Sequence, residues 1–160
     1  MLQQENEKLC LRKFYVLHLS SVKMILVQIK FLLEPEMKIQ TINFEKKFAK
    51  FDDHWSPKVI AEMNDYQFKL VKFKGEFVWH QHDDTDETFI VLKGKMQILF
   101  KDAQVDLNEG EMLVVPKNTL HKPVAENECE IMLIEPRGVV NTGDSGGTLT
   151  AEQDLSLIHI

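Results

Sequence analysis

The sequence predicts an all-β protein, an antiparallel sandwich or barrel with one short helix before its strands. Two observations support this prediction. From Tyr66 to Ile134 the chain alternates apolar and polar residues in many short stretches separated by turn-forming residues, which is typical of antiparallel strands. The 160 residues contain no internal repeat long enough for two barrels, so we expect one domain with one core.

The expected helix lies ahead of the strands. Phe44, Phe48 and Phe51 are spaced so that their rings share one helical face, and charged residues surround them. We expect this face to pack against the barrel or against a partner subunit. The segment from Trp55 to Ile60 then follows as an extended stretch.

The first long strand is expected to begin at Tyr66. Apolar residues alternate with Gln67 and Lys69 up to Leu70, and the apolar parity changes at Leu70–Val71. This change predicts a bulge or a bend. Farther on, Lys93–Gly94 favours a compact hairpin. We expect further strands at 88–92, 95–100, 105–107, 112–115, 119–124 and 130–134.

The charge distribution argues against a nucleic-acid surface. The formal net charge is −6, with +1 on residues 1–36 and −7 on the remainder, and phosphate contacts need clustered Lys and Arg. The apolar stretch 14–33 is interrupted by polar residues, so we expect neither a membrane span nor a signal peptide. Cys10 and Cys129 are too few for a disulfide framework, which favours reduced thiols and a cytoplasmic protein.

Four residues form a candidate metal site. His80 and His82 are two apart, so a strand would direct both imidazoles to one face. Glu87 opens the next apolar run, and His121 follows later. Three imidazoles and one carboxylate suit a divalent transition metal, with Fe, Mn, Ni, Zn and Cu all open.

The spacing of these residues resembles the first motif of the cupin superfamily. That motif is glycine, five residues, His-x-His, three or four residues, glutamate, six residues and glycine. Here four residues separate Gly75 from His80, and His82, Glu87 and Gly94 fall at the usual intervals. Only the first gap departs from the pattern, by one residue.

The second cupin motif is present with two departures. Gly110, Pro116 and His121 match it, whereas Asn118 stands where glycine is usual and Ala125 where asparagine is usual. Asn tolerates a left-handed backbone nearly as well as glycine, so we expect the turn to persist. The resemblance implies a jelly-roll barrel, a double-stranded β-helix, with His80, His82, Glu87 and His121 as metal ligands. The acidic run Asp83, Asp84 and Asp86 is expected to be a solvated loop.

Two functional hypotheses remain open. The resemblance implies a metal-dependent enzyme acting on a small oxygenated molecule, of the isomerase or epimerase type or the dioxygenase type. The alternative is a non-catalytic small-molecule-binding or accessory protein. Between Gly75 and Val124 no general acid or base stands out beyond the ligands, and fold and ligands do not choose between the hypotheses. Pocket-wall candidates, equally well explained as core, are Val78, Phe89, Met96 and Ile98.

The resemblance and the termini give further expectations. A homodimer is expected, with contacts through the helix face at 44–51 and the C-terminal loop. We expect residues 1–36 to be a non-native or disordered extension, residues 37–154 to form the single cupin domain with its metal-site core at about 66–136, and residues 155–160, LSLIHI, to be a translated sequencing adapter. His159 is therefore excluded from the site. The segment EPRGVVNTGDSGG after Ile134 is expected to be an exit loop.

Overall fold

The computed structural model describes residues 40–160, and the expectation for residues 1–36 lies outside this range. Within the described residues, one short helix precedes seven strands, and the strands pair antiparallel. This confirms the predicted antiparallel barrel with a short N-terminal helix. The elements are α2 (Phe44–Phe48), β1 (Lys58–Met63), β2 (Tyr66–Glu76), β3 (Glu87–Lys93), β4 (Lys95–Phe100), β5 (Gln104–Asn108), β6 (Met112–Val115) and β7 (His121–Pro136).

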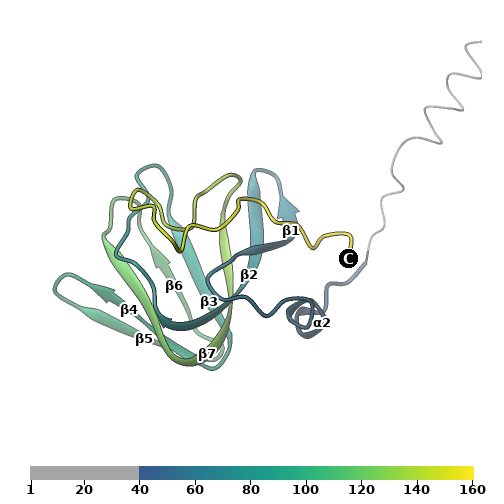
Figure 1. Ribbon diagram of the computed structural model, residues 1–160, viewed down its shortest axis with the longest axis horizontal. Helices are drawn as coiled ribbons and strands as arrows, with labels where there is room; N and C mark the ends of the chain where they lie inside the picture. The colour runs from purple at the N-terminus through teal and green to yellow at the C-terminus, as the bar shows by residue number, and fades with distance from the viewer. Residues whose placement is uncertain (1–39) are drawn as a thin grey trace, which may run out of the picture. The chain divides into compact units, whose positions relative to one another are not determined.

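The long strand β7 organises the barrel (Figure 1). It pairs with β2 along one side and with both β3 and β4 along the other. β1 extends the sheet beyond β2, β6 extends it beyond β3, and β5 pairs with β4. Two strands expected separately, at 119–124 and 130–134, are therefore parts of one bent strand.

The hairpin expected at Lys93–Gly94 does not form. Lys93 is paired with Glu130 of β7, and Gln97 is paired with Val124 of the same strand. β3 and β4 therefore pair with successive parts of β7 and not with each other. Gly94 makes the bend with a φ of +88°, and a Cβ there would lie 3.1 Å from the Glu128 carbonyl oxygen. Glycine is favoured because the bend is left-handed and presses against the backbone of β7.

The bulge expected at Leu70–Val71 is also wrong. The pairing of β2 with β7 is regular from Tyr66 to Phe73 and shifts only between Phe73 and Gly75. Gln67 and Lys69 are 1% and 2% exposed, so these polar side chains lie on the buried face of the strand. The alternation of inward and outward residues is therefore unbroken along β2. The inward side chains are polar at the start of the strand and apolar farther along.

Two apolar clusters fill the fold. Inside the barrel Trp55 stacks on Phe73 and Phe77, with ring centroids 4.3 and 4.9 Å apart. On the outer face of the sheet, Phe48 and Phe51 pack near Leu70. The predicted packing of the aromatic helix face on the barrel is confirmed for these two rings. Each fully buried ring contributes roughly 2–3 kcal/mol, whereas Phe44 stays 40% exposed.

After β7 the chain crosses back over the strand ends (Figure 1, yellow). We call residues 138–151 the C-terminal strap. Beyond it, the Val59 N–H donates to the Leu155 carbonyl and the Leu157 N–H donates to the Val59 carbonyl, each at 2.7 Å. Among residues 40–160, no helix has the length and apolar character needed to cross a membrane.

Candidate metal centre

The fold brings all four predicted ligands into one buried cluster. His80 and His82 lie between β2 and β3, Glu87 begins β3 and His121 begins β7. The backbones of His80 and His121 form an antiparallel bridge, with both N–H to carbonyl distances at 3.0 Å. All four residues are at most 7% exposed, so local sequence spacing and the β7 bridge together build the site.

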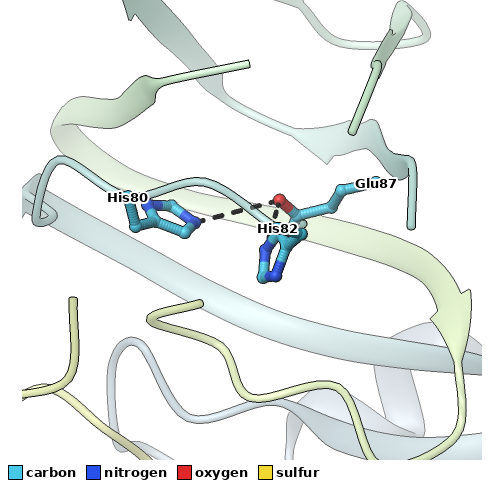
Figure 2. A group of neighbouring side chains, drawn as sticks. All are labelled: His80, His82 and Glu87. Atoms are coloured by element: carbon cyan, nitrogen blue, oxygen red, sulfur yellow. Dashed lines mark ion pairs between the residues drawn. The ribbon is translucent and has the colours of Figure 1, made fainter. Parts of the chain in front are cut away.

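The side chains converge on one oxygen of Glu87 (Figure 2). Its Oε2 lies 3.3 Å from His82 Nε2 and 4.0 Å from His80 Nε2, and 3.2 Å from His121 Nε2. Ligand atoms of His80, His82 and Glu87 all lie within 4.8 Å of one another. The His121 ring centroid is 4.3 Å from that of His80 but 6.3 Å from that of His82, so His121 approaches the cluster from the side of His80 and Glu87.

Two of the imidazoles are oriented by the backbone. His80 Nδ1 lies 3.1 Å from the Val78 carbonyl, and His121 Nδ1 lies 2.8 Å from the Thr119 carbonyl. A ring that donates its Nδ1–H to a carbonyl presents its Nε2 lone pair on the other side. His82 Nε2 is buried and makes no well-formed hydrogen bond, although Glu87 is close.

The electrostatics of the cluster favour a charged glutamate among histidines. Burial alone would raise the pKa of Glu87, but the close contacts with His121 and His82 and the charges of these two rings lower it to about 2. Burial lowers the pKa of His80 to about 4 despite the charge of Glu87. For His82, burial lowers the pKa, but the nearness and charge of Glu87 outweigh it and the pKa is raised.

These residues fit a divalent transition metal. Two ligands about 2.1 Å from one ion lie about 3.0–3.4 Å apart for angles from square to tetrahedral. The distances from Glu87 to His82 and His121, 3.3 and 3.2 Å, fall in this range, and the 4.0 Å to His80 requires a wider angle. The unpartnered His82 Nε2 is the kind of buried atom that a metal satisfies. The donor set of nitrogen and oxygen suits several first-row ions.

The loop between His82 and Glu87 is exposed at Asp83, Asp84 and Asp86, as expected. It is nevertheless tied to the second motif, because the Lys117 N–H donates to Asp86 Oδ1 at 2.9 Å and the Asn118 N–H donates to the His82 carbonyl at 2.8 Å. Asn118 has a φ of +58°, which confirms the predicted left-handed turn. The loop and the turn therefore hold each other beside the ligands.

The space beside His80 and Glu87 is small and mostly apolar, whereas His82 lines a larger pocket of about 350 Å³ between residues 81–85 and 138–144. A cavity of about 10 Å³ is lined by His80 and Glu87 together with aromatic side chains that include Trp55 and Phe89. Such a volume holds about one water molecule. Of the four predicted wall residues only Phe89 lines this cavity, whereas Met96 and Ile98 are core residues and Val78 packs against the core.

Three buried polar residues near the site were not predicted. Gln67 on β2 pairs with Glu135 on β7, and the pairing of Thr88 with Ile134 places Glu135 beside Glu87. Lys69 Nζ donates to Glu135 Oε1 at 2.9 Å, with both side chains at most 3% exposed. Glu135 Oε2 and Gln67 Oε1 are buried without partners. Burial and the charge of Glu87 raise the pKa of Glu135 to about 7, although Lys69 opposes this.

The sequence held a weak signal for this group. Glu135 ends the otherwise apolar run Ile131–Ile134, where a charged residue is unusual inside a strand that is buried on both faces. Gln67 and Lys69 alternate with apolar residues like ordinary surface residues, so their burial could not be recognised from the pattern.

Comparisons with known proteins agree with this geometry. The cupin domain family matches residues 69–135. A cupin-2 domain containing protein from Shewanella frigidimarina is 64% identical, with a TM-score of 0.60, and the match covers 61% of this chain and 95% of that one.

Two curated proteins of Bacillus subtilis match more briefly. The uncharacterized protein YdbB is 45% identical over 64 residues, which cover 39% of this chain and 57% of YdbB. Quercetin 2,3-dioxygenase is 38% identical over 68 residues, 39% of this chain and 20% of that enzyme. The chain thus matches only part of the length of these curated relatives.

The antiparallel barrel, the two glycine-bounded motifs and the extensive likeness to the Shewanella protein lead to one conclusion: the chain belongs to the cupin superfamily.

Proposed function

We propose that this protein binds a divalent transition metal through His80, His82, Glu87 and His121, and that it is an enzyme acting on a small oxygenated molecule. The convergence of three buried imidazoles on Glu87 Oε2 is the observation that carries the proposal. Four neutral or singly charged ligands leave a net positive charge on the ion. Reactions of the isomerase or epimerase type and of the dioxygenase type are both compatible with such a centre.

Each ligand has a definite task in this proposal. His80 and His121 present Nε2 because their Nδ1 atoms are held by carbonyl groups, Glu87 supplies the negative charge, and His82 contributes its otherwise unpartnered Nε2. A bound ion would polarise a carbonyl or hydroxyl oxygen, or support oxygen chemistry if it is iron. The apolar cavity beside His80 would exclude bulk water from the reacting group.

The pair of Lys69 and Glu135 supports the catalytic hypothesis. Glu135 lies beside Glu87 on the neighbouring strand and keeps one buried oxygen free. A carboxyl group in this position can accept or return a proton near a metal-bound substrate. The proposal therefore assigns the proton-carrying role to a residue outside the two motifs.

The dioxygenase type gains support from the partial match to quercetin 2,3-dioxygenase. The alternative is a non-catalytic small-molecule-binding or accessory cupin. The pockets beside His80 and His82 would admit a bound ligand and a substrate on the same terms, so they do not choose between this alternative and an enzyme. Measured turnover of a substrate distinguishes the enzyme hypothesis from the binding-protein alternative.

Metal analysis is the first test. Tag-free protein purified without chelators is analysed by mass spectrometry, in parallel with a His80→Ala/His121→Ala variant and a His54→Ala control. His54 bonds to Glu128 at the surface. We expect near-stoichiometric metal in the wild type and the control and none in the double variant. Equal metal content in all three, or none in any after reconstitution, would contradict the proposed centre.

A substrate panel then tests catalysis. Metal-loaded wild type is screened against sugars, keto acids and phenolic compounds, alongside Glu135→Gln. We expect Glu135→Gln to keep its metal and lose most turnover, because the amide occupies the same space but cannot accept a proton. If no compound is turned over but some bind, the binding-protein alternative replaces the enzyme hypothesis.

We further propose a cytoplasmic homodimer. Met112 and Val114 on the edge strand β6 are 57% and 45% exposed, and apolar exposure at a sheet edge is suited to contact with a second copy. The thiol of Cys129 is free and buried, which suits a reducing compartment. Light scattering after size exclusion tests the assembly, and a monomeric mass would contradict it.

A further inference from the structure

The C-terminal strap lies directly against the segment that carries two of the proposed metal ligands. Gln81 stands between His80 and His82. Its N–H donates to Asp144 Oδ1 at 3.3 Å, and its carbonyl accepts from the Asp144 N–H, also at 3.3 Å. Asp144 therefore engages both backbone polar groups of the residue that separates the two histidines.

Gly143 brings the strap into closer contact than any other residue type would allow. Its φ is +52°, and a Cβ built there would overlap the Gln81 carbonyl oxygen and lie 2.9 Å from the carbonyl carbon. The same Cβ would lie 3.4 Å from His82 Nδ1. The strap backbone is thus in contact with the peptide of Gln81 and passes beside the His82 ring.

The strap is itself anchored away from the histidines. Asn141 Nδ2 donates to the carbonyls of Trp55 and Leu149, both at 2.9 Å, and Asn141 Oδ1 accepts from the Ala151 N–H at 2.9 Å. Thr142 is fully buried, and its Oγ1 lies 2.9 Å from Thr150 Oγ1. Because these bonds do not involve the ligand segment, the strap can act as an independent support for it.

We propose that Gly143 and Asp144 are positioning residues for the metal centre. They fix the peptide of Gln81 and so direct His80 and His82 toward Glu87, and their effect reaches the metal only through these histidines. The inference rests on the metal-binding part of the proposed function. Groups that orient metal ligands from outside typically change metal affinity by about 10–100-fold, and the strap is expected to act on this scale.

Titration of the full-length chain with Co²⁺ tests the role of Gly143, because the visible spectrum of the bound ion reports ligand geometry. Gly143→Ala is compared with Gly146→Ala, a matched control with a similar φ of +60° but nothing within 4 Å of an added Cβ. We expect Gly143→Ala to weaken Co²⁺ binding about 10–100-fold and to alter the spectrum, and Gly146→Ala to resemble wild type. Equal weakening in both variants would overturn the proposal.

Asp144 provides a second test that stands even if Gly143→Ala fails to fold. Asp144→Ala removes the acceptor for the Gln81 N–H, whereas Asp144→Asn keeps an acceptor oxygen and removes only the charge. We expect about a tenfold loss of Co²⁺ affinity in Asp144→Ala and substantial rescue in Asp144→Asn. Equal losses in both would assign the effect to charge near His82 and overturn the positioning role.

The outcomes separate this inference from the metal centre itself. If wild type does not bind Co²⁺, the proposed metal centre fails and the strap proposal fails with it. If wild type and all strap variants bind Co²⁺ equally, with the same spectrum, the metal centre stands and only the role of the strap is overturned.

Discussion

Asn118 shows at the scale of one residue how this chain departs from the usual cupin motif without losing the turn. Its backbone is left-handed, with a φ of +58°, and its N–H donates to the carbonyl of His82. Left-handed conformations cost most L-residues roughly 1–2 kcal/mol, and Asn and Gly much less. The turn beside His121 therefore accepts two residue types and disfavours the rest.

Substitution of Asn118 tests this account. Asn118→Ala and Asn118→Gly both lose the side-chain bond to the Asp83 carbonyl, so their difference reports the backbone conformation. We expect Asn118→Ala to be less stable than Asn118→Gly by about 1 kcal/mol, as measured by urea denaturation. Equal stability would show that the turn does not impose the left-handed conformation in solution.

Cys129 gives a pH-dependent contribution to stability. Burial raises the pKa of its thiol from 9.0 to about 11. Because the folded-state pKa exceeds the unfolded value, the neutral thiol stabilises the fold fully below about pH 9, and this contribution is lost as the pH rises toward 11. The loss is at most about 1.4 kcal/mol per pH unit.

Unfolding midpoints in urea measured across this alkaline range check the prediction. We expect the wild type to lose stability more steeply with rising pH than Cys129→Ala, which has no thiol to ionise. Parallel pH profiles of the two proteins would show that the thiol titrates alike in the folded and unfolded chains.

At the scale of the elements, β2 and β7 hold a buried ion pair next to the metal site. Lys69 and Glu135 lie on these two strands with almost no exposure. Breaking a buried pair leaves one charge unpaired and typically costs about 3–5 kcal/mol, whereas an apolar pair of similar volume is often tolerated. Because apolar residues could fill this part of the core, the Lys69–Glu135 pair is a candidate for a functional role.

We expect Lys69→Met to destabilise the protein by about 3–5 kcal/mol and Lys69→Met/Glu135→Leu to recover much of this loss. The Lys69→Met variant should be least stable at alkaline pH. Burial raises the pKa of Glu135, and the unpaired carboxyl must ionise as the pH rises. Lys58→Met, which breaks the more exposed pair with Asp53, should cost at most about 1 kcal/mol. Similar losses for Lys58→Met and Lys69→Met in urea denaturation would contradict this assignment.

At the scale of the whole molecule, a bound metal would join parts of the chain that are far apart in sequence. The proposed ligands come from the segment before β3, the start of β3 and the start of β7. An ion that binds only the folded state stabilises it by about 2.7 kcal/mol at a free concentration 100 times its Kd. Metal removal should therefore lower the Tm of the entire barrel.

Thermal melts with and without Co²⁺ check this expectation. We expect Co²⁺ to raise the Tm of wild type and of His54→Ala, and a chelator to reverse the change. His121→Ala should lose most of the increase if His121 is a ligand, although its ring lies 6.3 Å from that of His82. A full increase in His121→Ala would reduce the centre to His80, His82 and Glu87.

The sequence alone predicted the fold class and the residues that meet at the candidate site. Alternation in short segments predicts antiparallel strands wherever one face is buried, and the glycine, histidine and glutamate spacings resemble the two cupin motifs. The left-handed turn at Asn118 was predictable for the same reason. Apart from His121, which the second motif supplied and the bridge to His80 brings in, each of these features depends on residues close together in the chain.

Only the tertiary structure decided which faces are buried and which segments touch. Gln67 and Lys69 look like surface residues until Glu135 on β7 is seen opposite them. Lys93–Gly94 looks like a hairpin until both flanking strands are seen to follow β7. Gly143 and Asp144 gain a role only where the strap meets Gln81. The physical reason is that burial and long-range contact depend on the partner segment, which local periodicity does not encode.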